Sequence, residues 1–384
     1  MTPLALLFAL AFLVSVDVRI LAPVLPSIAA SLRDTPGSVG LAMTAFSMTY
    51  GTSALIYGPI SDRFGRIPVV RAAGLGFSLC TVLAAWAQST PQFVGARLLA
   101  GAFAGAVIPL TLVFIGDTVA YERRQIVLGR FSAITSAALA FSASIGGALA
   151  YAVSWRAMLT GYAMAALLPV ALLWRLPAAS QGRPARRPGA VRFQDFLRDR
   201  HARAVYVAVF LEGFLLWGGV TYLGAFAAHR HGLNQLAIGL LLALLGVATM
   251  SGGLLMGRLR GRLSEGQLAG FGGTAMGAGF LLLVPRWPWP VFGLAMLPLG
   301  LGLACLHTTL QVRGTEISPA ARGKAFALFA VSLFTGIAAG TAALGRLVDA
   351  GRYEAVLVLA GLGLVLIGLG TAQSGKRAAA PRPA

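Results

Sequence analysis

The sequence predicts an all-α integral membrane protein with twelve transmembrane helices in two six-helix bundles. Of the 384 residues, 57% are hydrophobic and 11% are charged, whereas soluble domains carry about 25% charged residues. Apolar stretches recur that match the roughly 20 residues a helix needs to cross a bilayer. A polar, arginine-rich segment near the middle separates these stretches into two sets of six.

The first six apolar stretches fall at roughly residues 4–30, 38–60, 68–88, 92–116, 128–151 and 157–175. The second six fall at roughly residues 204–227, 237–257, 266–285, 290–312, 325–346 and 354–373. We therefore expect an N-terminal bundle over 1–175, a central loop over 176–203, a C-terminal bundle over 204–373 and a tail over 374–384. Such paired six-span repeats are one of the known transporter plans, with a substrate site near the midplane.

The distribution of positive charge predicts the orientation. The net charge is +19, and most Lys and Arg residues fall in alternate loops, with the largest group in the central loop. Cytoplasmic loops of membrane proteins carry this excess, so we expect a multi-pass protein of the cytoplasmic (inner) membrane with both termini and the central loop in the cytoplasm. The basic residues form no nucleic-acid motif, and we expect no nucleic-acid partner.

A nine-residue segment after the second apolar stretch carries a family resemblance. It reads Gly58-Pro59-Ile60-Ser61-Asp62-Arg63-Phe64-Gly65-Arg66. This resembles the G-x-x-x-D-R-x-G-R signature of the major facilitator superfamily. Asp17 with the later Leu25-Pro26 resembles the first-span motif of the drug:proton antiporter branch, and Arg97 with Gly101 resembles the R-x-x-x-G motif of the fourth span.

The fifth span departs from the antiporter pattern. The family motif there is G-x-x-x-G-P-x-x-G-G, and this chain has Ser142-Ala143 in place of the central Gly-Pro, keeping only Gly146 and Gly147 as a helix-packing motif. Because the complete motif is associated with exporters, export and import both stay open.

Three charged residues inside spans are candidates for proton coupling. Charges in lipid are costly and are usually partnered or functional. Asp17 and Glu212 can take up and release a proton, and the resemblance implicates Arg97 in coupling. We expect Asp17 to pair with Arg97 across helices. The alternative for Asp17 and Arg97 is a purely structural ion pair. For Glu212 the alternatives are contact with a cationic substrate and, if it lies close to the cytoplasmic surface, no functional role.

The signature segment and the fourth span suggest a conformational latch. The resemblance implies that Gly58, Asp62, Arg63, Gly65 and Arg66 hold the two halves in one state. Asp117, at the end of the fourth span, is the expected partner of Arg66. The alternative is an ordinary loop that sets topology.

Polar, aromatic and Met side chains on several spans are candidates for the substrate cavity, because such groups form adaptable pockets. They are Arg19, Met43, Phe46, Tyr50, Phe214, Trp217, Tyr222 and His307. For the aromatic residues, packing in the core or against lipid is an equal alternative. His307 could also shuttle protons, and a neutral, hydrogen-bonded packing role is its main alternative.

These features predict a proton-coupled secondary transporter that works by alternating access and exports drugs or small amphipathic molecules. The alternative is a proton symporter for a metabolite or a lipid-like substrate. An enzyme, a channel or a sensor is more distant, because His229 and His231 fall in a loop without a neighbouring carboxylate and no Walker loop is present. We expect a monomer without cofactor or metal that binds a small-molecule substrate, protons and the bilayer.

Overall fold

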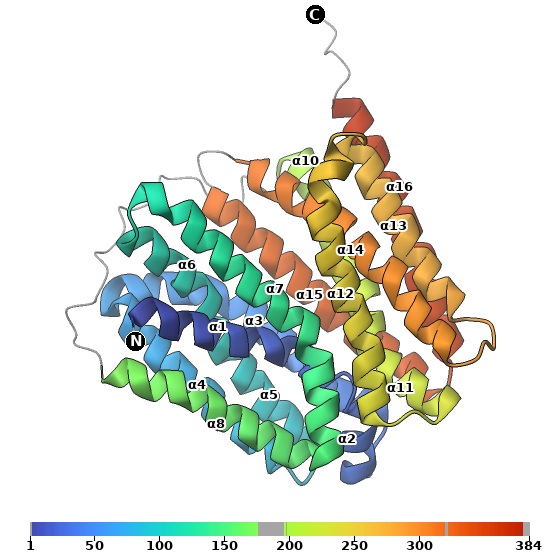
Figure 1. Ribbon diagram of the computed structural model, residues 1–384, viewed down its shortest axis with the longest axis horizontal. Coiled ribbons are helices and arrows are strands. Elements are labelled where there is room, and N and C mark those ends of the chain that lie inside the picture. The colour runs from blue at the N-terminus through green and yellow to red at the C-terminus, as the bar shows by residue number, and fades with distance from the viewer. Residues whose placement is uncertain (1, 176–195, 197, 319–321, 379–384) are drawn as a thin grey trace, which may run out of the picture. The chain divides into compact units, whose positions relative to one another are not determined.

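The computed structural model describes residues 2–175, 196, 198–318 and 322–378, and these residues form helices joined by short turns, without a strand (Figure 1). The chain divides into two compact units. The first comprises Met1–Pro188 and Asn234–Gly239, and the second comprises Gly189–Leu233 and Leu240–Ala384. Most of the predicted central loop (176–195 and 197) and the end of the predicted tail (379–384) lie outside the described residues.

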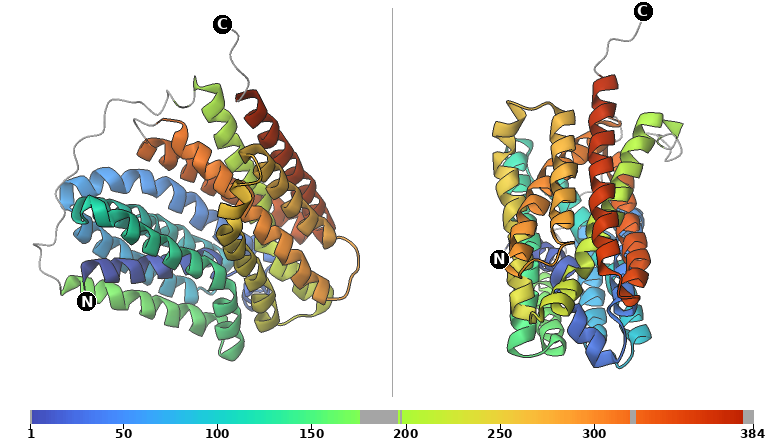
Figure 2. Two further views of the ribbon diagram at one scale, coloured as in Figure 1. Left: turned by 45° about the horizontal axis from the view of Figure 1, so that its top comes forward. Right: turned by 90° about the vertical axis from the view of Figure 1, so that its right-hand side faces the viewer.

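The first unit contains eight helices that lie alongside one another (Figures 1 and 2). They are α1 (Pro3–Ile20), α2 (Leu25–Leu32), α3 (Pro36–Phe64), α4 (Arg66–Ala85), α5 (Thr90–Ala104), α6 (Val107–Thr118), α7 (Tyr121–Ala152) and α8 (Trp155–Trp174).

Two spans predicted as single helices are broken in the first unit. The first span stops at Ile20 and resumes at Leu25, and Pro23 in the turn between them lacks the N–H that a helical hydrogen bond needs. The fourth span divides at Gly105 into α5 and α6. The signature segment, by contrast, is not a loop. Its residues 58–64 form the last turns of α3, Gly65 separates α3 from α4, and Arg66 is the first residue of α4.

The second unit contains α10 (Arg200–Glu212), the π-helix η2 (Gly213–Trp217), α11 (Gly218–His231), α12 (Gln235–Arg260), α13 (Glu265–Leu282), α14 (Pro290–Glu316), α15 (Arg322–Asp349) and α16 (Tyr353–Ala378). The seventh predicted span is therefore an α-helix interrupted by one π-helical turn. The first residues of α12 cluster with the first unit.

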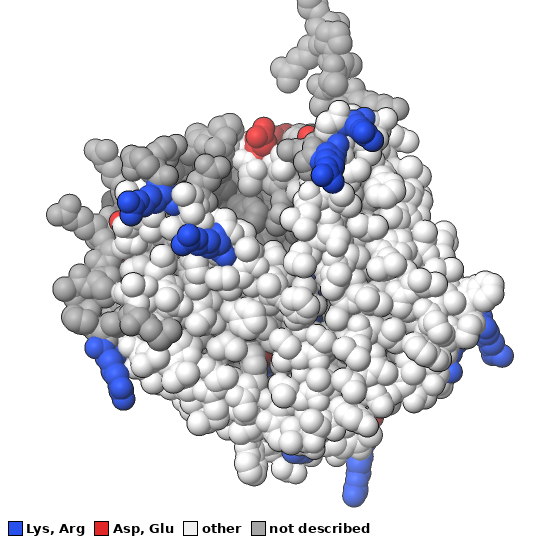
Figure 3. All heavy atoms as spheres, in the orientation of Figure 1, with Lys and Arg blue, Asp and Glu red and all other residues white. Residues whose placement is uncertain are grey.

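The surface matches a lipid environment. Among the described residues, ten helices or continuous helix pairs are long and apolar enough to cross a membrane, or eleven if the bent pair Pro36–Ser53 and Leu55–Phe64 is one span. The predicted ninth span, α13, is not among them because glycines and two polar residues of its first turn lower its hydropathy. Large apolar side chains are exposed, such as Leu254 at 81% and Leu366 at 70%. Figure 3 shows a face on which basic side chains gather toward the edges.

Glycines allow the closest helix contacts. A Cβ at Gly101 on α5 would lie 2.3 Å from the carbonyl oxygen of Phe46 on α3, and a Cβ at Gly336 on α15 would lie 2.1 Å from the carbonyl oxygen of Phe210 on α10. Real Cβ atoms do not approach so closely, so any side chain would separate these helices. Small residues perform this function in membrane bundles, where packing rather than the hydrophobic effect holds helices together.

Candidate functional site

A fully buried ion pair lies in the first unit. Asp17 is in the last turn of α1, and Arg97 is in the middle of α5. The guanidinium donates two hydrogen bonds to the carboxylate, from Nη1 to Oδ1 at 3.1 Å and from Nη2 to Oδ2 at 2.6 Å. Both side chains are 0% exposed. The structure thus brings together the two residues expected to pair, and both carboxylate oxygens are occupied by the arginine.

The surroundings of this pair are aromatic. The Arg97 guanidinium lies 4.2 Å from the ring centroid of Phe46 on α3, which stabilises a cation away from water. Tyr162 on α8 donates its hydroxyl hydrogen to the carbonyl oxygen of Leu13, one turn before Asp17. The Nε atom of Arg97 is buried and has no partner among the described residues. The guanidinium therefore depends on Asp17 for its charge compensation.

A second buried acid–base pair lies in the second unit. Glu212, the last residue of α10, is 0% exposed, and its Oε2 lies 3.0 Å from Nδ1 of His307 on α14. The other carboxylate oxygen, Oε1, is buried without a hydrogen-bond partner among the described residues. The His307 side chain is 21% exposed. Glu212 is therefore deep inside its unit, and the sequence did not indicate that His307 is its partner.

The signature segment forms a compact polar cluster in the first unit. Arg66 is 3% exposed, and its Nε donates to Asp117 Oδ2 on α6 at 3.2 Å while its Nη1 donates to Asp62 Oδ1 at 2.5 Å. Nη1 also donates to the hydroxyl of Ser61 at 2.7 Å. Arg66 thus joins the end of α3 to the end of α6, and Asp117 is its partner as expected.

The two glycines and Arg63 of the signature lie in different surroundings. Gly65 has φ of +89°, in the region that glycine adopts without strain, so it makes the sharp break between α3 and α4. A Cβ at Gly58 would meet nothing within 4 Å. Arg63 is exposed, with its guanidinium 5.3 Å from the ring centroid of Phe64.

The candidate cavity residues fall into two groups. Met43, Phe46 and Tyr50 are buried on α3, and Tyr222 is buried on α11, where its hydroxyl donates to the carbonyl oxygen of Thr341 at 2.8 Å. The partly exposed candidates are Arg19 on α1, Phe214 and Trp217 on η2, and His307 on α14. Tyr222 is therefore engaged in holding α15, and Phe46 packs on Arg97.

The comparison with protein families decides the identity. Residues 7–341 match the model described as "Major Facilitator Superfamily". The chain belongs to this superfamily. It is a multi-pass membrane transporter that binds small molecules, and it is not an enzyme.

Curated relatives include transporters and efflux pumps. The chain is 25% identical over 360 residues to the uncharacterized MFS-type transporter YceJ of Bacillus subtilis (strain 168), covering 91% of this chain and 90% of the relative. It is 24% identical to a chloramphenicol resistance protein of Pseudomonas aeruginosa, covering 72% and 66% of the two chains. It is 30% identical to the multidrug efflux pump LfrA of Mycolicibacterium smegmatis over 44% of this chain and 34% of the relative.

Solved structures of other transporters share the fold. A point mutant of the nucleoside transporter NupG superposes with a TM-score of 0.80 at 14% identity, covering 96% of this chain and 99% of that chain. A D-xylose-proton symporter superposes with a TM-score of 0.76 at 18% identity, covering 96% of each chain. These similarities establish the major facilitator fold of twelve helices.

The two glycines kept from the fifth-span motif make backbone contacts in this transporter. A Cβ at Gly146 would lie 2.3 Å from the carbonyl oxygen of Ile20 on α1. A Cβ at Gly147 would lie 2.3 Å from the carbonyl oxygen of Gln235, in the first turn of α12, which clusters with the first unit. The ends of α1 and α12 both approach α7 because these positions carry no side chain.

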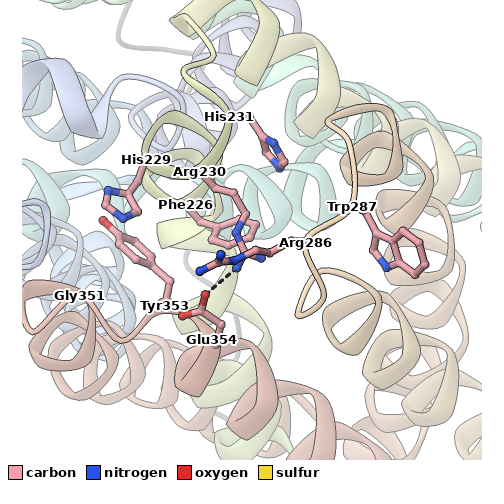
Figure 4. A pocket seen from close by; sticks show the side chains of 9 residues that line it. All are labelled: Phe226, His229, Arg230, His231, Arg286, Trp287, Gly351, Tyr353 and Glu354. Carbon is pink, nitrogen blue, oxygen red and sulfur yellow. Dashed lines mark hydrogen bonds and ion pairs between the residues drawn. The ribbon is translucent and has the colours of Figure 1, made fainter.

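A polar pocket of about 400 Å³ lies at one end of the second unit (Figure 4). It is lined by Phe226, His229, Arg230, His231, Arg286, Trp287, Gly351, Tyr353 and Glu354. Arg230 pairs with Glu354 at 2.6 Å and donates to the carbonyl oxygens of Leu283 and Val284, so it braces α11 against the end of α13 and the start of α16.

The positions of the histidines in this pocket differ from those expected from the sequence. His229 and His231 belong to the last turn of α11 rather than to a loop, and Glu354 lines the same pocket. The His229 ring stacks on Tyr353 with centroids 5.0 Å apart. Among the described residues, no group of three or more His, Cys, Asp or Glu side chains is arranged to hold a metal ion.

Two contributors to these sites gave little signal in the sequence. Ser61 lies within the signature but at one of its variable positions, and it accepts a hydrogen bond from Arg66. Arg124 on α7 donates to the carbonyl oxygens of Gly116 and Val119 at the end of α6. Cations favour helix C-termini, and a basic residue shortly after a helix end is the only signal that indicates such a role.

Proposed function

We propose that this transporter is a proton-coupled exporter of drugs or other small amphipathic molecules, working by alternating access. The observation that carries the proposal is the buried pair of Asp17 and Arg97, whose side chains are both 0% exposed. A charge pair inside a membrane protein is costly unless it is compensated or used. This pair contains one group that can gain a proton and one that cannot lose its own.

Protonation of Asp17 changes the balance of this site. With Asp17 ionised, the two charges cancel, and the guanidinium holds both carboxylate oxygens. When Asp17 takes a proton, Arg97 is left as an uncompensated buried cation. Such a cation is strongly destabilising. A rearrangement of α1 against α5 that relieves it therefore lowers the free energy of the unit. Proton binding is thereby linked to a change of conformation, which is the requirement for coupling.

The cluster around Arg66 is the proposed conformational latch. Arg66 is buried and holds Asp117 and Asp62 together, so the ends of α3 and α6 move as one body. In our proposal these ends face the cytoplasm, as do both termini, and the protein lies in the cytoplasmic membrane as a monomer. The support for this orientation is the distribution of Lys and Arg, through the positive-inside rule.

The direction of transport and the cargo rest on the relatives. A chloramphenicol resistance protein and a multidrug efflux pump are among them, and the first-span motif around Asp17 resembles that of the antiporter branch. Phe214 and Trp217, the partly exposed aromatic side chains of η2 in the second unit, are proposed to contact the substrate. Aromatic side chains of this kind accept varied lipophilic compounds.

The second candidate function is proton symport of a metabolite or a lipid-like molecule. The loss of Gly-Pro at Ser142-Ala143 favours it, as does the likeness in fold to a D-xylose-proton symporter. The two candidates differ in the direction of flux relative to the proton gradient.

A reconstituted system tests the proposal. Proteoliposomes are given an inward or an outward pH gradient, and flux of chloramphenicol and a panel of lipophilic cations is followed for wild type, Asp17→Asn and the control Asp34→Asn. Asp34 is an exposed carboxylate of the same unit. We expect flux opposite to the proton gradient in wild type and the control, and none above background in Asp17→Asn. Flux along the proton gradient would support symport. Equal gradient-driven flux in Asp17→Asn would refute the role of this residue.

A further inference from the structure

The buried pair in the second unit differs from Asp17–Arg97 in its chemistry. Glu212 has one oxygen 3.0 Å from His307 Nδ1 and another that is buried without a partner among the described residues. Its side chain is 0% exposed, whereas His307 is 21% exposed. The carboxyl group therefore has a vacant acceptor in a site closed to water, and the imidazole is the member of the pair that reaches the surface.

Charge balance gives this site one proton. Asp17 and Arg97 are together neutral when the carboxyl is ionised, because arginine keeps its proton. Glu212 and His307 are together neutral only with one shared ionisable proton, either as carboxylate and imidazolium or as carboxylic acid and imidazole. Without that proton the site holds a single buried negative charge, and an isolated buried charge is costly. This cost favours the two states in which the pair holds one proton.

Among the described residues, the side chain that pairs with Glu212 is that of His307. The elements packed against α10 are η2, α14, α15 and α16. Gly213 lies against Leu333 and Gly336 of α15, and Leu215 lies against Gly363 of α16. None of these contacting residues is ionisable. The ionisable groups described on α14, α15 and α16 besides His307 are Cys305, Arg313, Glu316, Lys324, Arg346, Asp349, Tyr353 and Glu354.

These other groups are remote from the level of Glu212 or are not cations. Arg313 is six residues from His307, which is about 9 Å along a helix that rises 1.5 Å per residue. Lys324 is nine residues from Leu333, about 13 Å by the same rise. Cys305 is a buried thiol on α14. On α10 itself, Tyr206 donates its hydroxyl hydrogen to the carbonyl oxygen of Ala325.

The backbone beside Glu212 is unusual for a transmembrane helix. The π-helix η2 begins at Gly213, directly after Glu212. Isolated π-helical turns are rare and are frequent at functional sites. Gly213 and Gly218, at the two ends of this turn, lie against the backbone of α15. The turn is therefore firmly packed on one side, while Glu212 projects to α14.

We propose that Glu212 and His307 form a second proton site, which adds a second coupled proton to the transport cycle. His307 passes the proton between Glu212 and the surface, and the site exchanges it when the second unit rearranges. This inference rests on the proposed function for its coupling to transport. The presence of the proton at Glu212 can be tested without any substrate.

The coupling ratio tests the second proton. A neutral substrate such as chloramphenicol is used in proteoliposomes with a pH gradient of one unit and the membrane potential clamped at zero. Each coupled proton then supports a tenfold substrate gradient, since one pH unit is worth about 1.4 kcal/mol. We expect a gradient near 100-fold for wild type and near tenfold for Glu212→Gln. The control is Glu316→Gln, which removes an exposed carboxylate from the end of α14 and should leave the ratio unchanged.

Infrared difference spectroscopy tests the site itself on purified protein near neutral pH. In the variant His307→Gln the site is neutral only if Glu212 is a carboxylic acid. We therefore expect the spectrum of this variant to contain a protonated-carboxyl band. The double variant His307→Gln with Glu212→Gln should lack that band. Absence of that band in a folded, monodisperse His307→Gln variant would overturn the inference. A wild-type ratio of one proton would also overturn it while leaving the proposed function intact. Absence of any gradient-driven flux would overturn both coupling claims, whatever the band shows.

Discussion

Removal of either member of the buried Asp17–Arg97 pair should have unequal effects that depend on pH. Asp17→Asn leaves Arg97 as a buried cation that cannot lose its proton, although Phe46 at 4.2 Å retains part of its stabilisation. Arg97→Gln leaves a carboxylate that becomes neutral when it takes a proton. Removal of one partner of a buried pair costs roughly 3–5 kcal/mol. We expect Arg97→Gln to recover stability as pH falls, and Asp17→Asn not to.

The chain provides its own probes for this measurement. Cys80 and Cys305 are both buried and free, so a thiol-reactive fluorescent dye reports the temperature at which a detergent-purified sample unfolds. A loss of 3–5 kcal/mol corresponds to a lowering of the midpoint by roughly 6–20 °C in a unit of this size. The double variant Asp17→Asn with Arg97→Gln contains no buried charge at the site, and we expect a coupling energy of about 2–3 kcal/mol.

Additivity would refute this reasoning. If the midpoint shifts of the single variants add up in the double variant, the two charges do not depend on each other. If Arg97→Gln loses as much at pH 5 as at pH 8 relative to wild type, Asp17 does not neutralise itself by taking a proton. The proposed coupling step would then lose its physical basis.

Three further predictions concern the first unit. Asp117→Asn weakens a charged hydrogen bond of the latch arginine, and we expect a loss of about 1–3 kcal/mol and more rapid exchange between transport states in a spin-label distance measurement. Gly101→Ala should lower the unfolding midpoint because its Cβ would lie 2.3 Å from a carbonyl oxygen of α3, whereas Gly58→Ala should not, since nothing lies within 4 Å. The Thr90 hydroxyl, foremost among its hydrogen-bond donors, lowers the pKa of Asp34. This contribution is present above about pH 4 and is lost as pH falls through the lowered pKa. We expect Asp34→Asn to cost a few tenths of a kcal/mol at pH 7 and progressively less as pH falls below about 4, measured by the same dye assay.

Several features of the fold were predictable because they depend on short stretches of sequence. The length of each apolar stretch and its low content of charged residues indicate a segment that lies in lipid. The twelve spans were therefore predictable from local composition. The break at Gly65 was marked by its motif. The breaks at Gly105 and in the turn with Pro23 were not predicted, since single glycines and prolines also occur in continuous transmembrane helices. The low hydropathy of α13 is compatible with a span because it packs closely on α14 and α16.

The candidate sites were predictable only in part. A charged residue in an apolar stretch is conspicuous, so Asp17, Arg97, Glu212 and His307 were all recognisable as candidates. The partners of these residues were harder to predict. Asp17 and Arg97 each belong to a motif of the family, and their pairing was a hypothesis. Glu212 and His307 belong to no motif that we recognised, and they are 95 residues apart.

The sequence by itself determined that this protein lies in lipid, that it has two sets of six spans, and which few side chains carry charge inside them. These properties follow from hydropathy, which is local. The sequence suggested that Asp17 pairs with Arg97, but only the tertiary structure placed His307 beside Glu212. The reason is that the partner of a buried charge depends on how helices distant in sequence are rotated against each other, and in this chain glycine contacts set that rotation.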